Sequence, residues 1–345
     1  MIQSAPMPKL RVGVLYDATD SGEEEAAEAK SSRRKRRRPK HDHEEIHEAL
    51  KKTGHEPFYH TLDGTPESLH SLATERADLY FNLTESYAGD DTKEMHVAAY
   101  LELLGRRYTG AGPQGLFLAQ DKALAKKIFG FHGIRTPAFM TGHRGRLEWA
   151  HDIHFPVIVK PGLEDGSIGI RFSAVVGSLK ELMERIDAVH ADFDGPVLIE
   201  EYIEGREIYV AVLGNQDPEA LPIVELDLSK LPEGTPRIAG TEVKWEEGTE
   251  VYRSTQPFFP EDLGEEIENE LKQTAIAAYQ ALRLRDYGRI DIRLDAEGKA
   301  HVIECNPNPW LLSTAELSKA AKKSGRSHAD LIAEIVQFAI ARYGA

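Results

Sequence analysis

The sequence predicts a mixed α and β chain in three parts: an N-terminal α/β unit over residues 1–133, a small central α+β unit over 134–210 and a C-terminal α+β unit over 211–345. Strand-like and helix-like runs alternate in the first part, as in a parallel sheet with crossover helices. Short strands and a glycine-rich loop fill the middle, and a hairpin pattern between helical segments marks the end. The length of 345 residues also exceeds one ordinary compact domain.

In the N-terminal part, "LRVGVLY" (10–16) and "ADLYFNL" (77–83) are typical of buried strands. Helices are expected over 41–55, ending near Gly54, and over 92–105. The run "QGLFLAQDKALAKKIFGFHG" (114–133) predicts one long helix that closes the unit.

The central part begins with the strand "FPVIVKP" (155–161), followed by a loop, a short strand and a helix near 178–190. The strands "VLIEEYI" and "REIYVAVL" complete it. The C-terminal part holds "LPIVELDL", a polar stretch around "EVKW", a helix over 261–283, a hairpin over 287–306 and two closing helices. The polar segment 228–256 could be a loop that closes over a site, or an ordinary surface excursion.

Composition narrows the function. The formal net charge of −15 argues against nucleic acid as the main partner. The chain has no apolar run of about 18 residues, so no membrane span is expected. The start lacks a signal-peptide pattern. A single cysteine cannot form an internal disulfide, so the cytoplasm is the expected location.

One segment departs from this acidic character. Residues 23–40 place an acidic block before six consecutive basic residues, Arg33 to Arg38. The segment could dock an anionic partner. The favoured interpretation is a solvated loop inserted between a strand and a helix.

The hairpin carries the strongest chemical signal. With Glu297-Gly298 at the centre of its turn and Ala296 paired with Lys299, the register places Asp291 directly opposite Glu304. Opposed carboxylates on neighbouring strands repel each other, and a cation would relieve the repulsion.

Strand alternation then sorts the neighbouring side chains. Val302, Glu304 and Asn306 are expected on one face, while Ile303 and Cys305 point to the other, where a buried and inert cysteine is expected. Two carboxylates and an amide form an oxygen-only set that suits Mg²⁺. Arg289, on the same strand face as Asp291, could reach a phosphoryl or carboxylate oxygen.

A second signal lies in the central part. Lys160 ends a strand and precedes a loop containing Gly162, Gly166 and Gly169, where backbone amides could hold phosphate oxygens. This loop lacks the Gly-Lys-Ser/Thr of a Walker A motif. Taken alone it is weak support for a phosphate site.

Together, five ordered segments resemble the ATP-grasp superfamily, and within it the D-alanine–D-alanine ligase family, over the first strand and residues 77–340: "DKALAKKIFGFHGIRTP", "FPVIVKPGLEDGSIGI", "IEEYIEGREIYVAVLG", "EVKW" and "GRIDIRLD…VIECNPNP". The resemblance implies an ATP site and a metal site. The implied ATP contacts are Lys122, Lys160 and Ser167 at the phosphates, Glu200 at the adenine amine, the Ile203 backbone, Glu207 at the ribose, and Lys244. The implied Mg²⁺ ligands, which could also take Mn²⁺, are Asp291, Glu304 and Asn306, with Arg289 as the catalytic residue.

The resemblance further implies an ATP-dependent carboxylate–amine ligase that passes through an acylphosphate, acts on amino acids or short peptides, and forms a homodimer. A kinase-type relative and a non-catalytic ATP-binding protein are the alternatives. Retention of the three metal ligands and Arg289 argues against the non-catalytic alternative.

Departures from the family pattern gather in the amino-acid pocket. The family's amine-binding glutamate has only loose counterparts in Glu23 to Glu25, and the first of two loop serines is replaced by Gly166. Trp245 stands where the family has a tyrosine, and Trp310 where it has a glycine. For the pair that holds the second carboxylate, Ser313 and Thr314 are only nearby alternatives. The substrates are therefore expected to differ from two D-alanines.

Overall fold

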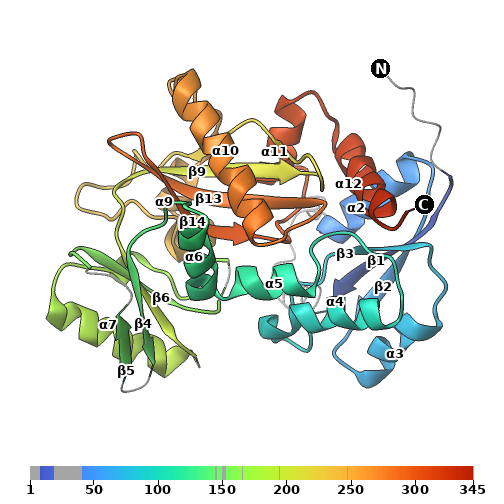
Figure 1. Cartoon of the computed structure of the whole chain (residues 1–345), viewed down its shortest axis with the longest axis horizontal. Helices are drawn as coiled ribbons and strands as arrows, with labels where there is room; N and C mark the ends of the chain where they lie inside the picture. Colours follow the sequence, from blue (N-terminus) through green and yellow to red (C-terminus); the bar gives the residue numbers. More distant parts are fainter. Residues whose placement is uncertain are drawn as a thin grey trace.

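The structure is a computed structural model that describes residues 8–18, 41–143, 146–149, 153–164, 166–193, 195–246 and 248–344. The described chain forms three sheets (Figure 1). The basic run 33–38 and the acidic candidates Glu23 to Glu25 lie outside the described residues. None of the helices in the described ranges is both long and apolar enough to cross a membrane.

The N-terminal unit is built on a parallel sheet in the order β2-β1-β3. Apolar strand residues such as Val12, Val14 and Phe81 are fully buried in it. The strand β2 and the helix α3 were not anticipated from the sequence. Its elements are β1 (Arg11–Asp17), α2 (Asp42–Lys52), β2 (Glu56–Leu62), α3 (Pro66–Thr74), β3 (Leu79–Asn82), α4 (Glu94–Leu103) and α5 (Pro113–Gln120).

The expected long helix over 114–133 is wrong, because it is two helices, α5 and α6 (Lys122–Phe131). Asp121 separates them. Its backbone is extended, and its side chain accepts a hydrogen bond of 2.9 Å from the amide of Leu124. An aspartate in this N-cap role begins a new helix. Figure 1 shows the two helices joining the N-terminal unit to the rest of the molecule.

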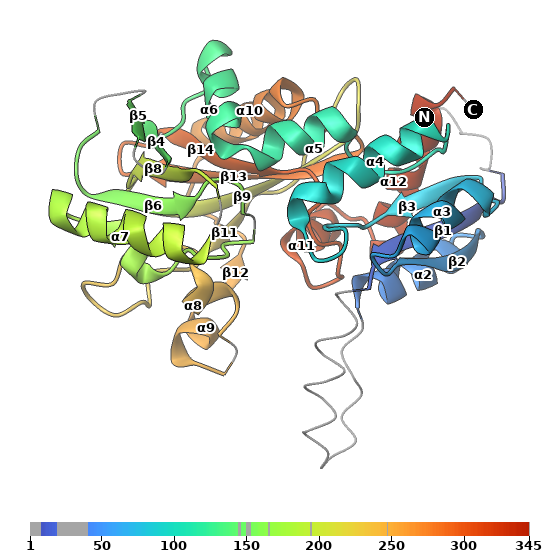
Figure 2. The ribbon, with the colours of Figure 1, turned by 90° about the horizontal axis from the view of Figure 1, so that it is seen from below.

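The central unit is an antiparallel sheet in the order β5-β4-β8-β6-β7. The helix α7 covers one face of it, along β6 (Figure 2). Its elements are β4 (Phe139–His143), β5 (Arg146–Trp149), β6 (Val157–Pro161), β7 (Val175–Val176), α7 (Leu179–Asp192) and β8 (Val197–Glu201).

The C-terminal unit holds the largest sheet, in the order β12-β11-β9-β13-β14, with β10 paired to β9. The polar stretch around "EVKW" forms the short helix α8. Its elements are β9 (Gly205–Leu213), β10 (Glu219–Ala220), β11 (Val224–Leu226), α8 (Thr241–Lys244), α9 (Glu250–Ser254), β12 (Pro257–Phe258), α10 (Glu265–Ala281), β13 (Tyr287–Asp295), β14 (Ala300–Asn306), α11 (Glu316–Lys323) and α12 (His328–Arg342).

Strand β9 shows how this sheet is buried. Ile208, Val210 and Val212 pack in the core beneath α10, while the alternate residues Tyr209 and Ala211 pack in the core that includes α11 and α12. Such a strand reads as one continuous apolar run because both of its faces are covered. It pairs with β13 along its whole length, so the boundary expected between residues 210 and 211 falls inside this strand.

The hairpin register is correct at the site, although the expected turn is wrong. Near the turn, Leu294 pairs with Ala300, which is one residue away from the expected register. A β-bulge at Ile303 then restores the offset, so Asp291 pairs with Glu304 as predicted. A bulge inserts one unpaired residue and reverses the alternation locally.

The bulge also corrects two side-chain directions. Val302 packs in the core beneath α10, so its expected place on the face of Glu304 is wrong. Ile303 lies on the opposite side from the one expected, in the wall of a cleft. Cys305 is buried in the apolar core, as predicted.

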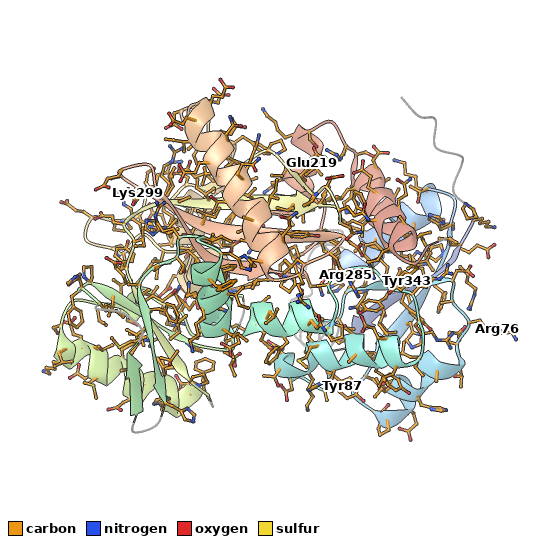
Figure 3. All side chains as sticks on the ribbon, viewed as in Figure 1. Arg76, Tyr87, Glu219, Arg285, Lys299 and Tyr343 are labelled. Carbon is orange, nitrogen blue, oxygen red and sulfur yellow. The ribbon has the colours of Figure 1, made fainter. Side chains whose placement is uncertain are left out.

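The N-terminal and C-terminal units share one core. Residues of β1 and α2, including Val14 and Ile46, cluster with residues of α12, including Ile332 and Val336. At this junction Figure 3 shows Arg285 and Tyr343 near each other, and both contact Tyr108: Arg285 donates to its hydroxyl at 2.6 Å, and the Tyr343 hydroxyl accepts from its amide at 3.3 Å.

Candidate active site

The paired strands β13 and β14 bring two carboxylates together. Asp291 is almost fully buried, at 2% exposure, and lies opposite Glu304. Arg289 donates two hydrogen bonds to Asp291, at 2.7 and 2.9 Å, a fork that fits a carboxylate closely. The guanidinium also lies over the ring of Tyr209, 4.9 Å from its centre. Arg289 is therefore held beside the carboxylate pair.

The two carboxylates differ in their affinity for protons. Burial raises the pKa of Asp291 to about 6, although Arg289 acts against it. Burial also acts to raise the pKa of Glu304, but the charges of Lys122, Lys244 and other cations outweigh it and hold that pKa at about 2. Glu304 is therefore ionised at neutral pH, whereas the negative charge of Asp291 depends on a nearby cation to stabilise it.

Three lysines surround this pair, each from a different element. Lys122 at the start of α6 has its Nζ 3.5 Å from a Glu304 oxygen and donates to the Glu164 carbonyl at 2.7 Å. Lys160 is the penultimate residue of β6, and Lys244 is the last residue of α8. Within the described ranges, Lys244 forms no ion pair. It is thus available to an anionic ligand.

A buried ion cluster fixes the position of Lys160. The two oxygens of Glu200, which is 1% exposed, lie 2.6 Å from the Nζ of Lys160 and 2.6 Å from the Nζ of Lys126. Lys126 also donates to the Ile303 carbonyl at 2.9 Å, next to Glu304. The Glu200 carboxylate therefore joins β8 to α6 and β6, and Lys126 extends the cluster to β14.

The sharing sets the pKa values of this cluster. Burial acts to raise the pKa of Glu200, yet two adjacent ammonium groups bring it below its usual value. Lys126 has only part of one carboxylate as its partner, so burial wins and its pKa falls. Sequence reasoning missed Lys126. The available signal was its spacing of four residues from Lys122, which places both on one helical face.

An ion pair between Arg293 and Glu207 holds the segment that connects β8 to β9. Arg293 contacts Glu207 at 2.7 Å and also donates to the carbonyls of Ile203 and Gly205, at 3.1 and 3.0 Å. These bonds bring the predicted ribose and adenine contacts into one rigid turn. The sequence analysis also missed Arg293. The available signal was strand alternation, which places Arg293 on the same face as Arg289 and Asp291.

The loop after β6 has a constrained backbone. Gly166 and Ser167 both have positive φ, at 62° and 63°, and such a value is costly for serine. Ser167 donates to the Ala239 carbonyl at 2.8 Å, and Thr241 donates to the Ser167 carbonyl at 3.2 Å. The loop is therefore fastened to the segment before α8.

These groups converge on one cleft between the central and C-terminal units, with about 580 Å³ of empty space when the open solvent at its mouth is included. Of the predicted site residues, eight line it, whereas Lys122, Arg289 and Asn306 lie beside it. The eight are Lys160, Ser167, Glu200, Ile203, Glu207, Lys244, Asp291 and Glu304.

Asn306 is positioned by a further residue that the sequence did not reveal. Its side-chain oxygen accepts from the Asn308 amide at 3.0 Å. The Asn308 side chain in turn accepts from the Tyr287 hydroxyl at 2.7 Å and donates to the Thr84 carbonyl at 3.1 Å. The N-terminal unit thus contacts the end of the carboxylate-bearing strand directly.

The charges in and around the cleft balance, although the protein is acidic. Three cationic and five anionic side chains line it, and three further cations and one further anion flank it, which gives six of each, whereas the whole chain carries −15. The cations are Lys122, Lys126, Lys160, Lys244, Arg289 and Arg293; the anions are Glu200, Glu201, Glu207, Asp291, Glu304 and Glu316. A region with this many cations in an acidic chain favours an anionic ligand accompanied by a cation.

Comparison with known proteins identifies relatives of this chain. The family description "D-ala D-ala ligase C-terminus" matches residues 130–337. A D-alanine–D-alanine ligase of Bordetella petrii is 35% identical over 84% of the chain and 84% of its own length. The chain belongs to the D-alanine–D-alanine ligase family. Another ligase of this family, from Halalkalibacterium halodurans, is 34% identical over 86% of the chain and 92% of its own length.

Not every relative within this range has an assigned activity. The uncharacterized protein y4sG of Sinorhizobium fredii is 36% identical over 77% of the chain and 75% of its own length. The D-alanine–D-alanine ligase of Bacillus anthracis complexed with ATP superposes with a TM-score of 0.71 at 22% identity, covering 96% of the chain and 97% of that structure. This match confirms the predicted three-part ATP-grasp fold.

Proposed function

We propose that the chain is an ATP-dependent carboxylate–amine ligase that forms an amide bond through an acylphosphate, with release of ADP and phosphate. Family membership supports the reaction class. The observation that carries the proposal is the pairing of Asp291 with Glu304 in a cleft that also holds Lys160 and Lys244. Charge of both signs at this density suits a nucleotide with its cation better than a neutral ligand.

The donor set fits a hard divalent cation. Among the described residues, no group of three or more His, Cys, Asp or Glu converges on one point, so a thiolate or imidazole site is not supported. Asp291, Glu304 and Asn306 offer only oxygen ligands, which suits Mg²⁺, or Mn²⁺ in its place. Such a cation neutralises charge on phosphoryl oxygens.

The surrounding residues divide the remaining tasks. Lys122, Lys160 and the Ser167 loop hold phosphate oxygens, and Lys244, which forms no ion pair within the described ranges, supplies a further cation. Glu207 and the Ile203 backbone hold the nucleoside, kept in place by Arg293. The expected contact of Glu200 with the adenine amine stays a proposal, since its oxygens lie on two lysines.

Arg289 completes the reacting centre. Its charge stabilises the transferring phosphoryl group and the tetrahedral intermediate of amine attack. No protein nucleophile is needed, and burial holds the pKa of Cys305 well above its usual value, so its thiolate is scarce. The cleft walls orient the acid and the nucleotide.

The substrates are amino acids or short peptides, and we propose that they differ from two D-alanines. A cytoplasmic homodimer is part of the same proposal. Exposed apolar side chains on three consecutive helices support the proposed dimer interface. They are Leu103 on α4 (85% exposed), Phe117 on α5 (46%) and Phe131 on α6 (86%). Exposed apolar side chains of this size on adjoining elements are typical of contact surfaces.

The test is turnover with Mg-ATP and a panel of D- and L-amino acids and short peptides. Ligation is supported if ADP release requires both an acid and an amine, and if mass spectrometry shows a product whose mass is the sum of the acid and the amine minus one water. ADP release with one substrate and a phosphorylated product would identify the kinase-type alternative. Nucleotide binding without turnover on any pair would identify the non-catalytic one.

A further inference from the structure

Two tryptophans contact each other near residues that line the cleft. The rings of Trp245 and Trp310 lie 5.4 Å apart, edge to face at 74°. Trp245 directly follows the cleft residue Lys244, and Trp310 follows Asn306 by four residues. The pair therefore joins the segment after α8 to the loop after β14, which begins directly after the candidate metal ligand Asn306.

Trp245 is also tied to the phosphate loop. Its indole N–H donates to the Gly166 carbonyl at 2.8 Å, and the Gly166 Cβ position would lie 3.7 Å from the ring. Gly166 precedes Ser167, whose side chain faces the cleft and bonds to Ala239. A displacement of the Trp245 ring would therefore shift the backbone of the loop that we assign to phosphate binding.

The rings remain half open to solvent. Trp245 is 44% exposed and Trp310 is 45% exposed, although an indole is among the largest apolar groups a protein can bury. An exposed apolar side chain alone needs no explanation, but two in contact beside a reactive centre form a ready surface for a ligand.

The local charges indicate what kind of ligand. Glu246, the residue after Trp245, is paired with Arg171 at 3.3 Å, and Glu242 lies 3.9 Å from the same arginine. The carboxylates beside the pair thus face a cation of their own. With these carboxylates already paired, the exposed parts of the two rings offer mainly apolar surface, which suits an apolar or aromatic group.

We propose that Trp245 and Trp310 form a specificity wall that receives an apolar or aromatic side chain of one substrate. Trp245 transmits that contact to the phosphate loop through its bond to Gly166. This inference rests on the proposed ligase function. It names the substrate class: amino acids or peptides with a side chain larger than the methyl group of alanine.

Two variants separate the two roles. Trp310→Ala removes half of the wall and leaves the indole bond of Trp245 in place. Trp245→Phe keeps an aromatic ring and removes the N–H donor. Phe258→Ala, at 41% exposure on the edge strand β12 and outside the cleft lining, is the matched control.

The assay compares kcat/KM for alanine, leucine and phenylalanine of both chiralities, each tested as acid and as amine with Mg-ATP. Wild type should prefer leucine or phenylalanine to alanine. Trp310→Ala should lower that preference about tenfold or more, as expected when an apolar pocket loses its wall. Trp245→Phe should keep the preference and raise KM for ATP by roughly two- to twelvefold, the range for one lost hydrogen bond.

The outcomes are distinguishable. If no acid and amine pair drives ADP release in wild type, the proposed function fails, and this inference fails with it. If wild type ligates but Trp310→Ala leaves the preference unchanged, only the wall is overturned. If Trp245→Phe leaves KM for ATP unchanged, the transmission to Gly166 is overturned. Thermal melting and ATP affinity are measured for every variant to show that it is folded. Trp310→Phe, which keeps an aromatic ring, is included in case Trp310→Ala does not fold.

Discussion

Replacing Glu200 with glutamine should destabilise the protein strongly. Glu200 is 1% exposed and lies 2.6 Å from the ammonium groups of both Lys126 and Lys160. Glutamine has nearly the same shape, so packing is preserved while the negative charge is lost. Two buried cations would then remain without their shared anion.

The expected cost follows from the burial of the cluster. Removing one partner of a buried ion pair typically costs about 3–5 kcal/mol, because the remaining charge stays desolvated. Here one anion serves two cations, so the upper part of that range applies. With about 2.1 cal/mol/K of unfolding entropy per residue, the 345 residues give about 0.7 kcal/mol/K, so a loss of about 4–5 kcal/mol should lower the melting temperature by roughly 6–7 °C.

The pH dependence gives an independent check. The folded pKa of Glu200 lies below its ordinary value, so its contribution to stability is present above the unfolded pKa and lost as pH falls through the folded one. The difference in melting temperature between wild type and Glu200→Gln should therefore be constant above about pH 6 and shrink below about pH 4.

The control is Glu201→Gln, the same substitution one residue along β8, on a side chain that forms no ion pair within the described ranges. It should change stability by no more than about 0.5 kcal/mol. Adding Lys126→Met to Glu200→Gln should restore part of the loss, since both charges are then gone. A melting temperature of Glu200→Gln within 2 °C of wild type would refute the reasoning.

Three further predictions concern the site. Asp291→Asn and Glu304→Gln should each lower Mg-dependent kcat by about 10²-fold or more with the fold intact, since each removes charge stabilisation at the phosphoryl group; steady-state ADP release and circular dichroism test this. Cys305→Ala should keep most activity, because the thiol is buried in the apolar core and does not line the cleft. Arg293→Gln should raise KM for ATP about tenfold with a smaller change in kcat, because it frees Glu207 and the adjacent turn.

Matched variants make these predictions refutable. Asp295→Asn, at the hairpin turn, should leave turnover near normal, and Arg206→Gln, whose partners are Glu225 and Asp262, should leave KM for ATP unchanged. Normal turnover in Asp291→Asn would remove the metal assignment. Loss of activity in a folded Cys305→Ala would contradict the inert role of the thiol.

The hairpin shows how far strand alternation can lead. Alternation along one strand correctly placed Ile290 in the core and Asp291 in the cleft, because a regular strand has a period of two. On the partner strand the expected turn was one residue out, and the bulge at Ile303 compensated for it. A bulge leaves no mark in a pattern of apolar residues, so the correct pairing of Glu304 came with a wrong direction for Val302.

Lys126 shows a different limit. Its position on the face of Lys122 was visible in the sequence, but a lysine on a helix face is usually solvated. Only the approach of Glu200 from the central sheet makes it a buried cation, and that approach depends on a contact 74 residues away in the chain. Long-range ion pairs of this kind arise from tertiary packing and have no local signature.

For the same reason, the sequence motifs predicted where the site lies but did not predict the ion pairs inside it. Almost every anion of the cleft already has a cation from a distant element, and these pairs hold the reactive geometry before any ligand is present: Glu200 with Lys126 and Lys160, Glu207 with Arg293, Asp291 with Arg289, and Glu304 with Lys122. Groups held in this way need little reorganisation when charge develops on a substrate. Lys244, which forms no such pair within the described ranges, is the cation whose charge is left for a ligand to complete.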